Sequence, residues 1–96
     1  MSPLKRKKLS KIRSQLDRLD NSFIRLIKKR TNLVKKVLAL KESKSQIVDK
    51  KRIKIILSNI KKKSMKNNID PKITNRIWKN MIWSYIDYER RNFKKK

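Results

Sequence analysis

The 96-residue sequence contains no glycine and only two prolines, Pro3 and Pro71. Tight turns between short strands depend on glycine, so its absence argues against a β-sheet protein. We therefore expect an all-α fold of a few long helices, forming a single domain over residues 1–96. Thin helices of this length bury little surface alone, which makes a second copy of the chain a plausible partner.

Cysteine and histidine are also absent. Their absence excludes disulfides, thiol nucleophiles, imidazole bases and nearly every zinc site, so any chemistry must come from Lys, Arg, the few carboxylates and hydroxyls. No apolar run is long enough to span a bilayer, and no signal-peptide core is visible. We therefore expect a cytoplasmic protein without a membrane partner.

Acidic residues are scarce: 7 Asp and Glu stand against 31 Lys and Arg, for a net charge of +24. The positive electrostatic potential of such a protein attracts nucleic acid, anionic membranes and small anions alike. Lysine, isoleucine and asparagine are all overused, as happens when a genome favours A and T in its codons, and this bias accounts for many surface lysines. The charge predicts an anionic ligand without choosing among anions.

The first part of the chain predicts one long helix from Leu9 to about Glu42. It is preceded by a basic N-terminal segment, residues 1–8. We expect residues 1–8, like the basic tail 94–96, to fray. The helix would be about 50 Å long, and a helix of this length usually packs against another long helix. Its apolar positions recur at steps of three and four: Leu9, Ile12, Leu16, Leu19, Phe23, Leu26, Ile27, Leu33, Val34 and Val37.

Two shorter helices follow. After a loop at 43–48, Asp49 is a good N-cap for a second helix that fades near Lys66. Asp70 followed by Pro71 is a strong start signal for a third helix, which we expect to reach about Phe93. One face of the third helix carries Trp78, Ile82, Tyr85 and Glu89, and an adjoining face carries Ile73, Ile77, Met81, Ser84 and Tyr88.

Two cations of the long helix lie along its apolar stripe, and a third, Arg13, is rotated off the stripe by about 100°. Arg30 and Lys41 share one face and lie about 16 Å apart along the axis, so two long side chains leaning inward would close on one small anion. The alternative is that both extend to solvent beside the stripe. Arg13 lies about 25 Å from Arg30. It therefore serves a site completed by another subunit, or is a surface arginine paired with Asp17.

Glu89 shares its face with aromatic residues. Burial there would favour the protonated form of the carboxyl, which donates a hydrogen bond instead of carrying charge. The alternative is a salt bridge to one of the many lysines, or to the nearby Arg90 or Arg91.

Four segments resemble, in order and spacing, motifs of the all-helical (AroQ-class) chorismate mutases, and the resemblance covers about residues 9–93. The segments are Ile12-Arg13-Ser14-Gln15-Leu16-Asp17-Arg18-Leu19-Asp20, similar to I-R-x-x-I-D-x-L-D; Leu26-Ile27-Lys28-Lys29-Arg30, similar to L-L-x-x-R; Val37-Leu38-Ala39-Leu40-Lys41, similar to V-x-x-x-K; and Val48-Asp49-Lys50-Lys51-Arg52, similar to x-D-x-x-R.

The resemblance implies an intertwined homodimer of three-helix chains that rearranges chorismate to prephenate, in the shikimate pathway of aromatic amino-acid biosynthesis. It implies that cations hold the two carboxylates and the ether oxygen of the substrate, and that one of them enters the partner's site. These cations would be Arg13, donated to the partner, with Arg30, Lys41 and Arg52. The other substrate-binding residues would be Asp49, Tyr85 and Glu89.

The rearrangement is unimolecular and needs no proton transfer, metal or covalent step, so a chain without His or Cys is able to perform it. The enzyme must select the compact conformer of a dianion and stabilise negative charge on the breaking ether oxygen. Arginine binds carboxylates through forked hydrogen bonds. Lys41 would point its charge at the ether oxygen, with a protonated Glu89 donating from the other side.

Two departures from the family pattern leave other functions open. Ile53 stands where the family usually has a glutamate that meets the substrate hydroxyl, and Tyr85 stands where a small serine is common. At both positions the chain is similar to isochorismate-pyruvate lyase, a relative of the same fold. A small basic nucleic-acid-binding protein is an alternative from another class, although the lysines spread over all helices without forming one face. A structural helical dimer without catalysis would leave the inward cations unexplained.

Overall fold

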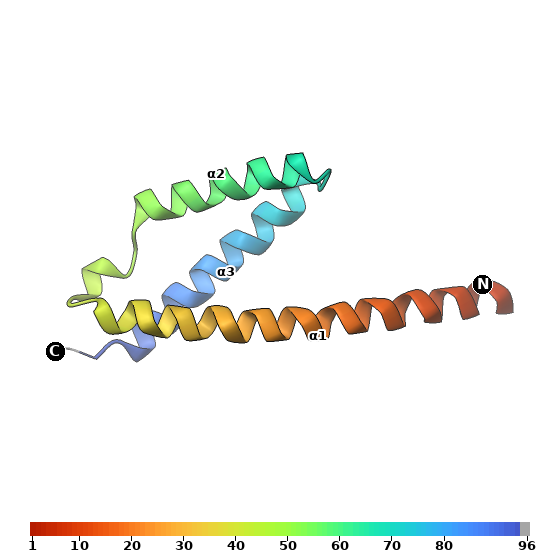
Figure 1. Ribbon diagram of the computed structural model, residues 1–96, viewed down its shortest axis with the longest axis horizontal. Helices are drawn as coiled ribbons and strands as arrows, with labels where there is room; N and C mark the ends of the chain where they lie inside the picture. Colours follow the sequence, from red (N-terminus) through yellow and green to blue (C-terminus); the bar gives the residue numbers. More distant parts are fainter. Residues whose placement is uncertain (95–96) are drawn as a thin grey trace. The chain divides into compact units, whose positions relative to one another are not determined.

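The computed structural model describes residues 1–94, and these form helices without any strand (Figure 1). The long helix α1 spans Pro3–Leu40, the short 3-10 turn η1 spans Lys44–Gln46, α2 spans Lys50–Lys66 and α3 spans Pro71–Asn92. The predicted all-α plan of long, short and medium helices is confirmed. The expected fraying of Lys95 and Lys96 lies outside the described residues. The chain forms two compact units, Met1–Leu33 and Val34–Lys96, and α1 contributes to both.

In the first unit the prediction of a frayed N-terminal segment is wrong, because α1 begins at Pro3. Ser2 acts as the N-cap: its Oγ accepts a hydrogen bond from the Lys5 amide at 3.2 Å, and its carbonyl accepts one from the Arg6 amide at 2.9 Å. Proline at the first helical position has a suitable φ and no N–H to satisfy. These local start signals outweigh the lack of an apolar pattern in the basic residues that follow.

The predicted apolar stripe of the first unit is exposed to solvent in the single chain. Ile12, Leu16, Leu19 and Phe23 each keep more than half of their surface accessible. An amphipathic helix is normally stabilised by packing of its apolar face. This stripe therefore has no cover within the unit itself.

The second unit has a small apolar core. Ile47, Ile82 and Ile86 are buried, the last two one turn apart on α3. The partly buried residues packed against them come from α2, from the segment before it and from the residue after α3: Ile53, Ile56 and Leu57, then Val48, then Phe93. Ile47 belongs to the segment predicted as a loop, yet it is only 4% exposed. The turn after α1 is therefore anchored in the core.

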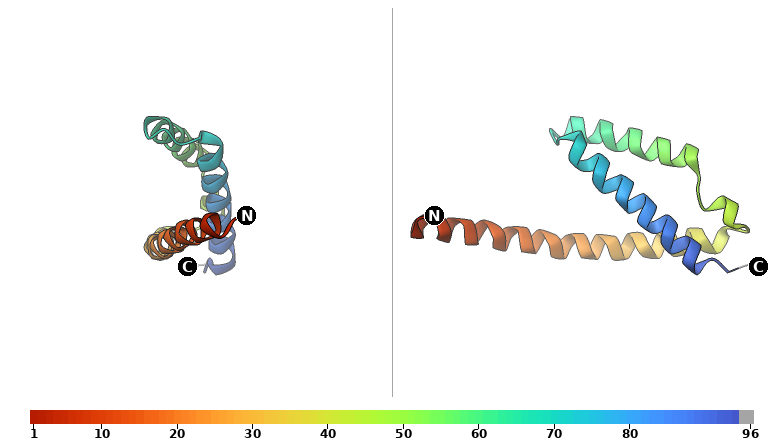
Figure 2. Two further views of the ribbon diagram at one scale, coloured as in Figure 1. Left: turned by 90° about the vertical axis from the view of Figure 1, so that its right-hand side faces the viewer. Right: turned by 180° about the vertical axis from the view of Figure 1, so that it is seen from behind.

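Helices α2 and α3 pack against each other and are joined by a tight turn, seen from two further directions in Figure 2. Their starts agree with the prediction: Asp49 accepts the Arg52 amide at 3.0 Å, and Asp70 accepts the Lys72 amide at 2.9 Å. The turn between them needs a left-handed residue, and in a glycine-free chain Asn68 takes this conformation with φ of 56°. Asparagine tolerates it better than most residues.

A buried hydroxyl pair joins α2 to α3 near this turn. Ser64, 3% exposed, donates to the Ile60 carbonyl at 2.6 Å, and its Oγ lies 2.6 Å from Thr74 Oγ1. We expect Ser64→Ala to lower the free energy of unfolding by about 1–3 kcal/mol, because it leaves a polar group on Thr74 with one partner fewer.

The matched control is Ser14→Ala. Ser14 makes the same type of intrahelical bond, to the Ser10 carbonyl at 3.1 Å, but it is exposed. Its replacement should change stability by less than about 0.5 kcal/mol. Urea unfolding of both variants followed by circular dichroism tests the difference, and equal losses would contradict a role for the buried pair.

Within residues 1–94, none of the helices combines the length and the apolar character required to cross a membrane.

Candidate active site

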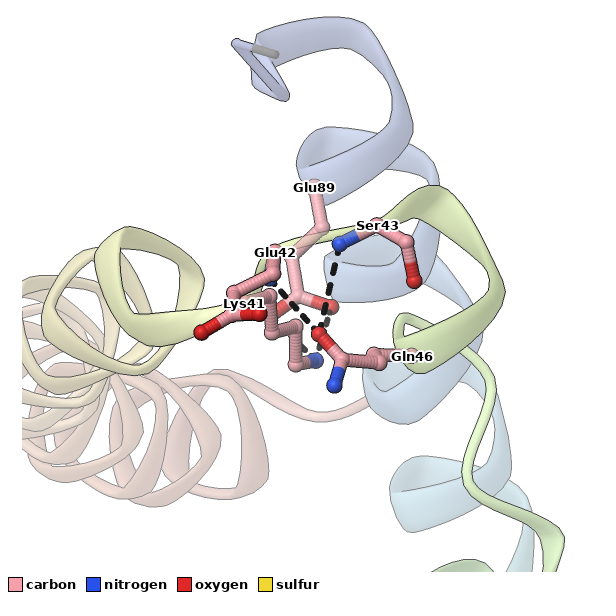
Figure 3. Close-up of polar contacts among 5 residues, drawn as sticks. All are labelled: Lys41, Glu42, Ser43, Gln46 and Glu89. Carbon is pink, nitrogen blue, oxygen red and sulfur yellow. Dashed lines mark hydrogen bonds and ion pairs between the residues drawn. The ribbon is translucent and has the colours of Figure 1, made fainter. Parts of the chain in front are cut away.

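An ion pair connects the end of α1 to α3. Lys41, the residue after the last residue of α1, donates from Nζ to both carboxylate oxygens of Glu89, at 3.1 Å to Oε1 and 3.0 Å to Oε2 (Figure 3). Glu89 is only 5% exposed, and the Lys41 side chain keeps 18% of its surface accessible. A charge removed from water needs such a partner, because an unpaired buried charge is strongly destabilising.

This pair corresponds to the salt-bridge alternative in the sequence analysis, with Lys41 as the partner in place of the adjacent arginines. Arg91 instead pairs with Asp87 at 2.9 Å on the exposed side of α3. Arg90 is exposed as well. Of the predicted face of α3, Ile82 and Glu89 are buried, and Trp78 and Tyr85 are half-buried. Ile86 is buried as well, although it was on neither predicted face.

An open hollow of about 670 Å³ lies beside Lys41, and we call it the Lys41 hollow. Four of its lining residues are charged: Lys41, Asp49, Lys50 and Lys51. The other lining residues are Val37, Leu40, Ser45, Gln46 and Val48. With three lysines against one aspartate, the hollow suits an anionic ligand.

Asp49 and Arg52 meet at the start of α2, where Asp49 Oδ1 accepts the Arg52 amide. This hydrogen bond uses one carboxylate oxygen of Asp49 for capping. The Arg52 side chain is exposed and does not line the Lys41 hollow. Its predicted contact with a substrate carboxylate stays a prediction.

Tyr85 is half-buried on α3, one helical turn before Glu89. Ile53 is also half-buried, and it packs against the isoleucine core of the second unit. The departure at Ile53 therefore has a structural role: it extends a small core.

The two remaining predicted cations belong to the first unit. Arg13 is exposed on α1, and the described residues contain no ion pair between it and Asp17. Arg30 is half-buried, and its Nε is shielded from solvent without a hydrogen-bond partner among residues 1–94. Buried donors are normally paired, so a shielded guanidinium N–H of this kind is suited to an anionic acceptor.

Gln46 is a residue of this region that was not predicted from the sequence. Its Oε1 accepts the backbone amide of Glu42 at 2.6 Å and that of Ser43 at 3.3 Å (Figure 3). The signal was present, because serine followed three residues later by glutamine is the pattern of a capping box. The cap starts a turn of only three residues, Lys44–Gln46, which is too short to show an apolar period.

No group of three or more His, Cys, Asp or Glu residues able to hold a metal ion occurs in the described part of the chain.

Comparison with known proteins identifies relatives of the chain. The family model described as chorismate mutase type II matches residues 12–90. The curated chorismate mutase of Methanocaldococcus jannaschii is 34% identical over 76 residues, which cover 78% of this chain and 77% of the relative. No solved structure matches the chain significantly.

Proposed function

The chain belongs to the chorismate mutase type II family and is an enzyme of that activity, and we propose that it converts chorismate to prephenate, without a cofactor, in a site completed by a second copy. The observation that carries the proposal is the Lys41–Glu89 pair. It joins two residues, 48 positions apart, for which the resemblance to the family implies contact with the ether oxygen. Lys41 of this pair also lines the Lys41 hollow, together with Lys50 and Lys51.

Lys41 has the main catalytic role in this proposal. As the ether bond breaks, negative charge gathers on its oxygen, and a cation already in place stabilises that charge at no cost of reorganisation. Glu89 holds the ammonium group in position.

The arginines bind the two substrate carboxylates. Arg30 has a shielded donor available for one of them, and Arg52 would turn from solvent toward the other. Asp49 and Tyr85 bind the remaining polar and apolar parts of the substrate ring. Forked binding of both carboxylates favours the compact conformer in which the reacting carbons approach each other.

A homodimer accounts for the remaining cation and for the exposed stripe. Arg13 and Arg30 lie on one continuous helix about 25 Å apart, too far to reach one small ligand in the same chain. A second α1 lying along the stripe of Ile12, Leu16 and Phe23 would cover these residues. It would also bring its own Arg13 to the site of the first chain.

The direct test is to incubate the purified protein with chorismate and, separately, with isochorismate. We expect loss of the ultraviolet absorbance of chorismate, with prephenate as the product. Release of salicylate and pyruvate from isochorismate, without prephenate from chorismate, would make the protein a lyase instead. Because Ile53 packs in the core, its apolar character does not by itself favour the lyase.

A further inference from the structure

Lys41 lies outside the helix that leads to it. Helix α1 ends at Leu40, and the Lys41 amide donates to the Leu38 carbonyl at 3.1 Å, in the tighter pattern of a helix end. Helix ends fray, because their last residues lack the full set of intrahelical backbone hydrogen bonds. Another part of the molecule must therefore hold the backbone at Lys41.

Gln46 fixes the backbone next to Lys41. Its side-chain oxygen accepts the two amides that directly follow Lys41, those of Glu42 and Ser43 (Figure 3). The turn that carries Gln46 is closed by the Ile47 amide, which donates to the Lys44 carbonyl at 3.1 Å. Ile47 is itself buried in the core. A continuous chain of contacts thus runs from the core, through Gln46, to the backbone beside Lys41.

We propose that Gln46 is a positioning residue for the reaction: its carboxamide oxygen fixes the backbone of residues 42–43 and so aims the Lys41 ammonium group. The proposal rests on the proposed function of Lys41. Two anchors act on this lysine in the ligand-free chain, Glu89 on its side chain and Gln46 on its backbone. When the ammonium group turns to the substrate, the backbone anchor remains.

The expected effect follows from the geometry that the reaction requires. Displacement of a reacting or charge-stabilising group by about 1 Å costs up to about 100-fold in rate. Gln46 is exposed, so its loss should change the position of Lys41 more than the stability of the fold. The effect should appear in kcat, with a much smaller change in KM.

The experiment compares Gln46→Met, which keeps the length of the side chain but removes the acceptor, with Gln46→Glu, which keeps an acceptor oxygen. We expect kcat for chorismate to fall about 10- to 100-fold in Gln46→Met and to return to within about threefold of wild type in Gln46→Glu. Because Gln46 lines the Lys41 hollow, the added charge of Gln46→Glu should raise KM for the dianion and is separated from kcat by measuring at saturating chorismate. The matched control is Gln15→Met, the same change at an exposed position of α1, which should leave kcat unchanged. An unchanged kcat in Gln46→Met, or no recovery in Gln46→Glu, would overturn the proposal.

Amide hydrogen exchange of the ligand-free wild-type protein tests the contact without any activity measurement. The Glu42 and Ser43 amides should exchange slowly, and Gln46→Met should speed both. Fast exchange in the wild type would overturn the proposal even if the variant failed to fold. If the wild type showed slow exchange but no chorismate turnover, the proposed function would fail while the contact itself stood.

Discussion

Lys41→Met should lower kcat for chorismate by at least about 100-fold, the loss typical when one preorganised charge-stabilising donor is removed. Methionine keeps much of the length of lysine and loses only the ammonium group. In our proposal this group meets the negative charge that develops on the ether oxygen. Initial rates at saturating chorismate, followed by the decrease in ultraviolet absorbance, measure the effect.

The same change should also destabilise the protein, and this must be separated from catalysis. Removing Lys41 leaves the buried Glu89 carboxylate unpaired, at a cost of about 3–5 kcal/mol. The double variant Lys41→Met/Glu89→Met replaces the whole pair with apolar groups and should recover most of this stability, but not the turnover. Near-wild-type kcat in the double variant would remove Lys41 and Glu89 from the reaction.

Mixing two inactive variants should restore activity if Arg13 acts in the partner's site. Arg13→Ala and Lys41→Met should each be nearly inactive alone. In a mixed dimer one of the two sites combines an intact Lys41 with an intact Arg13. After joint unfolding and refolding, random pairing should restore about a quarter of the wild-type activity.

The control for this experiment is Arg18→Ala, which removes a neighbouring arginine that donates to the Ser14 carbonyl at 3.4 Å on the exposed surface. This variant should be active without any mixing. If the mixture of Arg13→Ala and Lys41→Met is no more active than the average of the separate proteins, each site is contained in one chain. Analytical ultracentrifugation of the mixture establishes that dimers are present.

Local signals explain which elements were predictable. Asp49 and the Asp70-Pro71 pair were recognised as helix starts because a cap bonds amides only two or three residues away. The Ser2-Pro3 start follows the same rule, and it was missed because the basic residues after it lack an apolar pattern. The end of α1, expected near Glu42, lies at Leu40, since Gln46 takes up the amides that would have continued the helix.

Contacts between distant residues were not predictable in the same way. The apolar face of α3 indicated that Glu89 would be buried, but no pattern identified its partner, 48 residues away. Ile47 was assigned to a loop, yet it is among the most buried residues of the chain. A short segment between helices carries no periodicity from which its inward residue can be recognised.

The amino-acid sequence by itself determined the helical class of this protein, the order of its helices and the family to which it belongs, because composition, caps and motif spacing act over a few residues. Only the tertiary structure decided that Lys41 pairs with Glu89, that Ile53 extends the core and that Gln46 holds the chain after α1. These outcomes depend on how α1, the turn and α3 come together, and packing of this kind selects partners by burial and geometry that no short stretch of sequence contains.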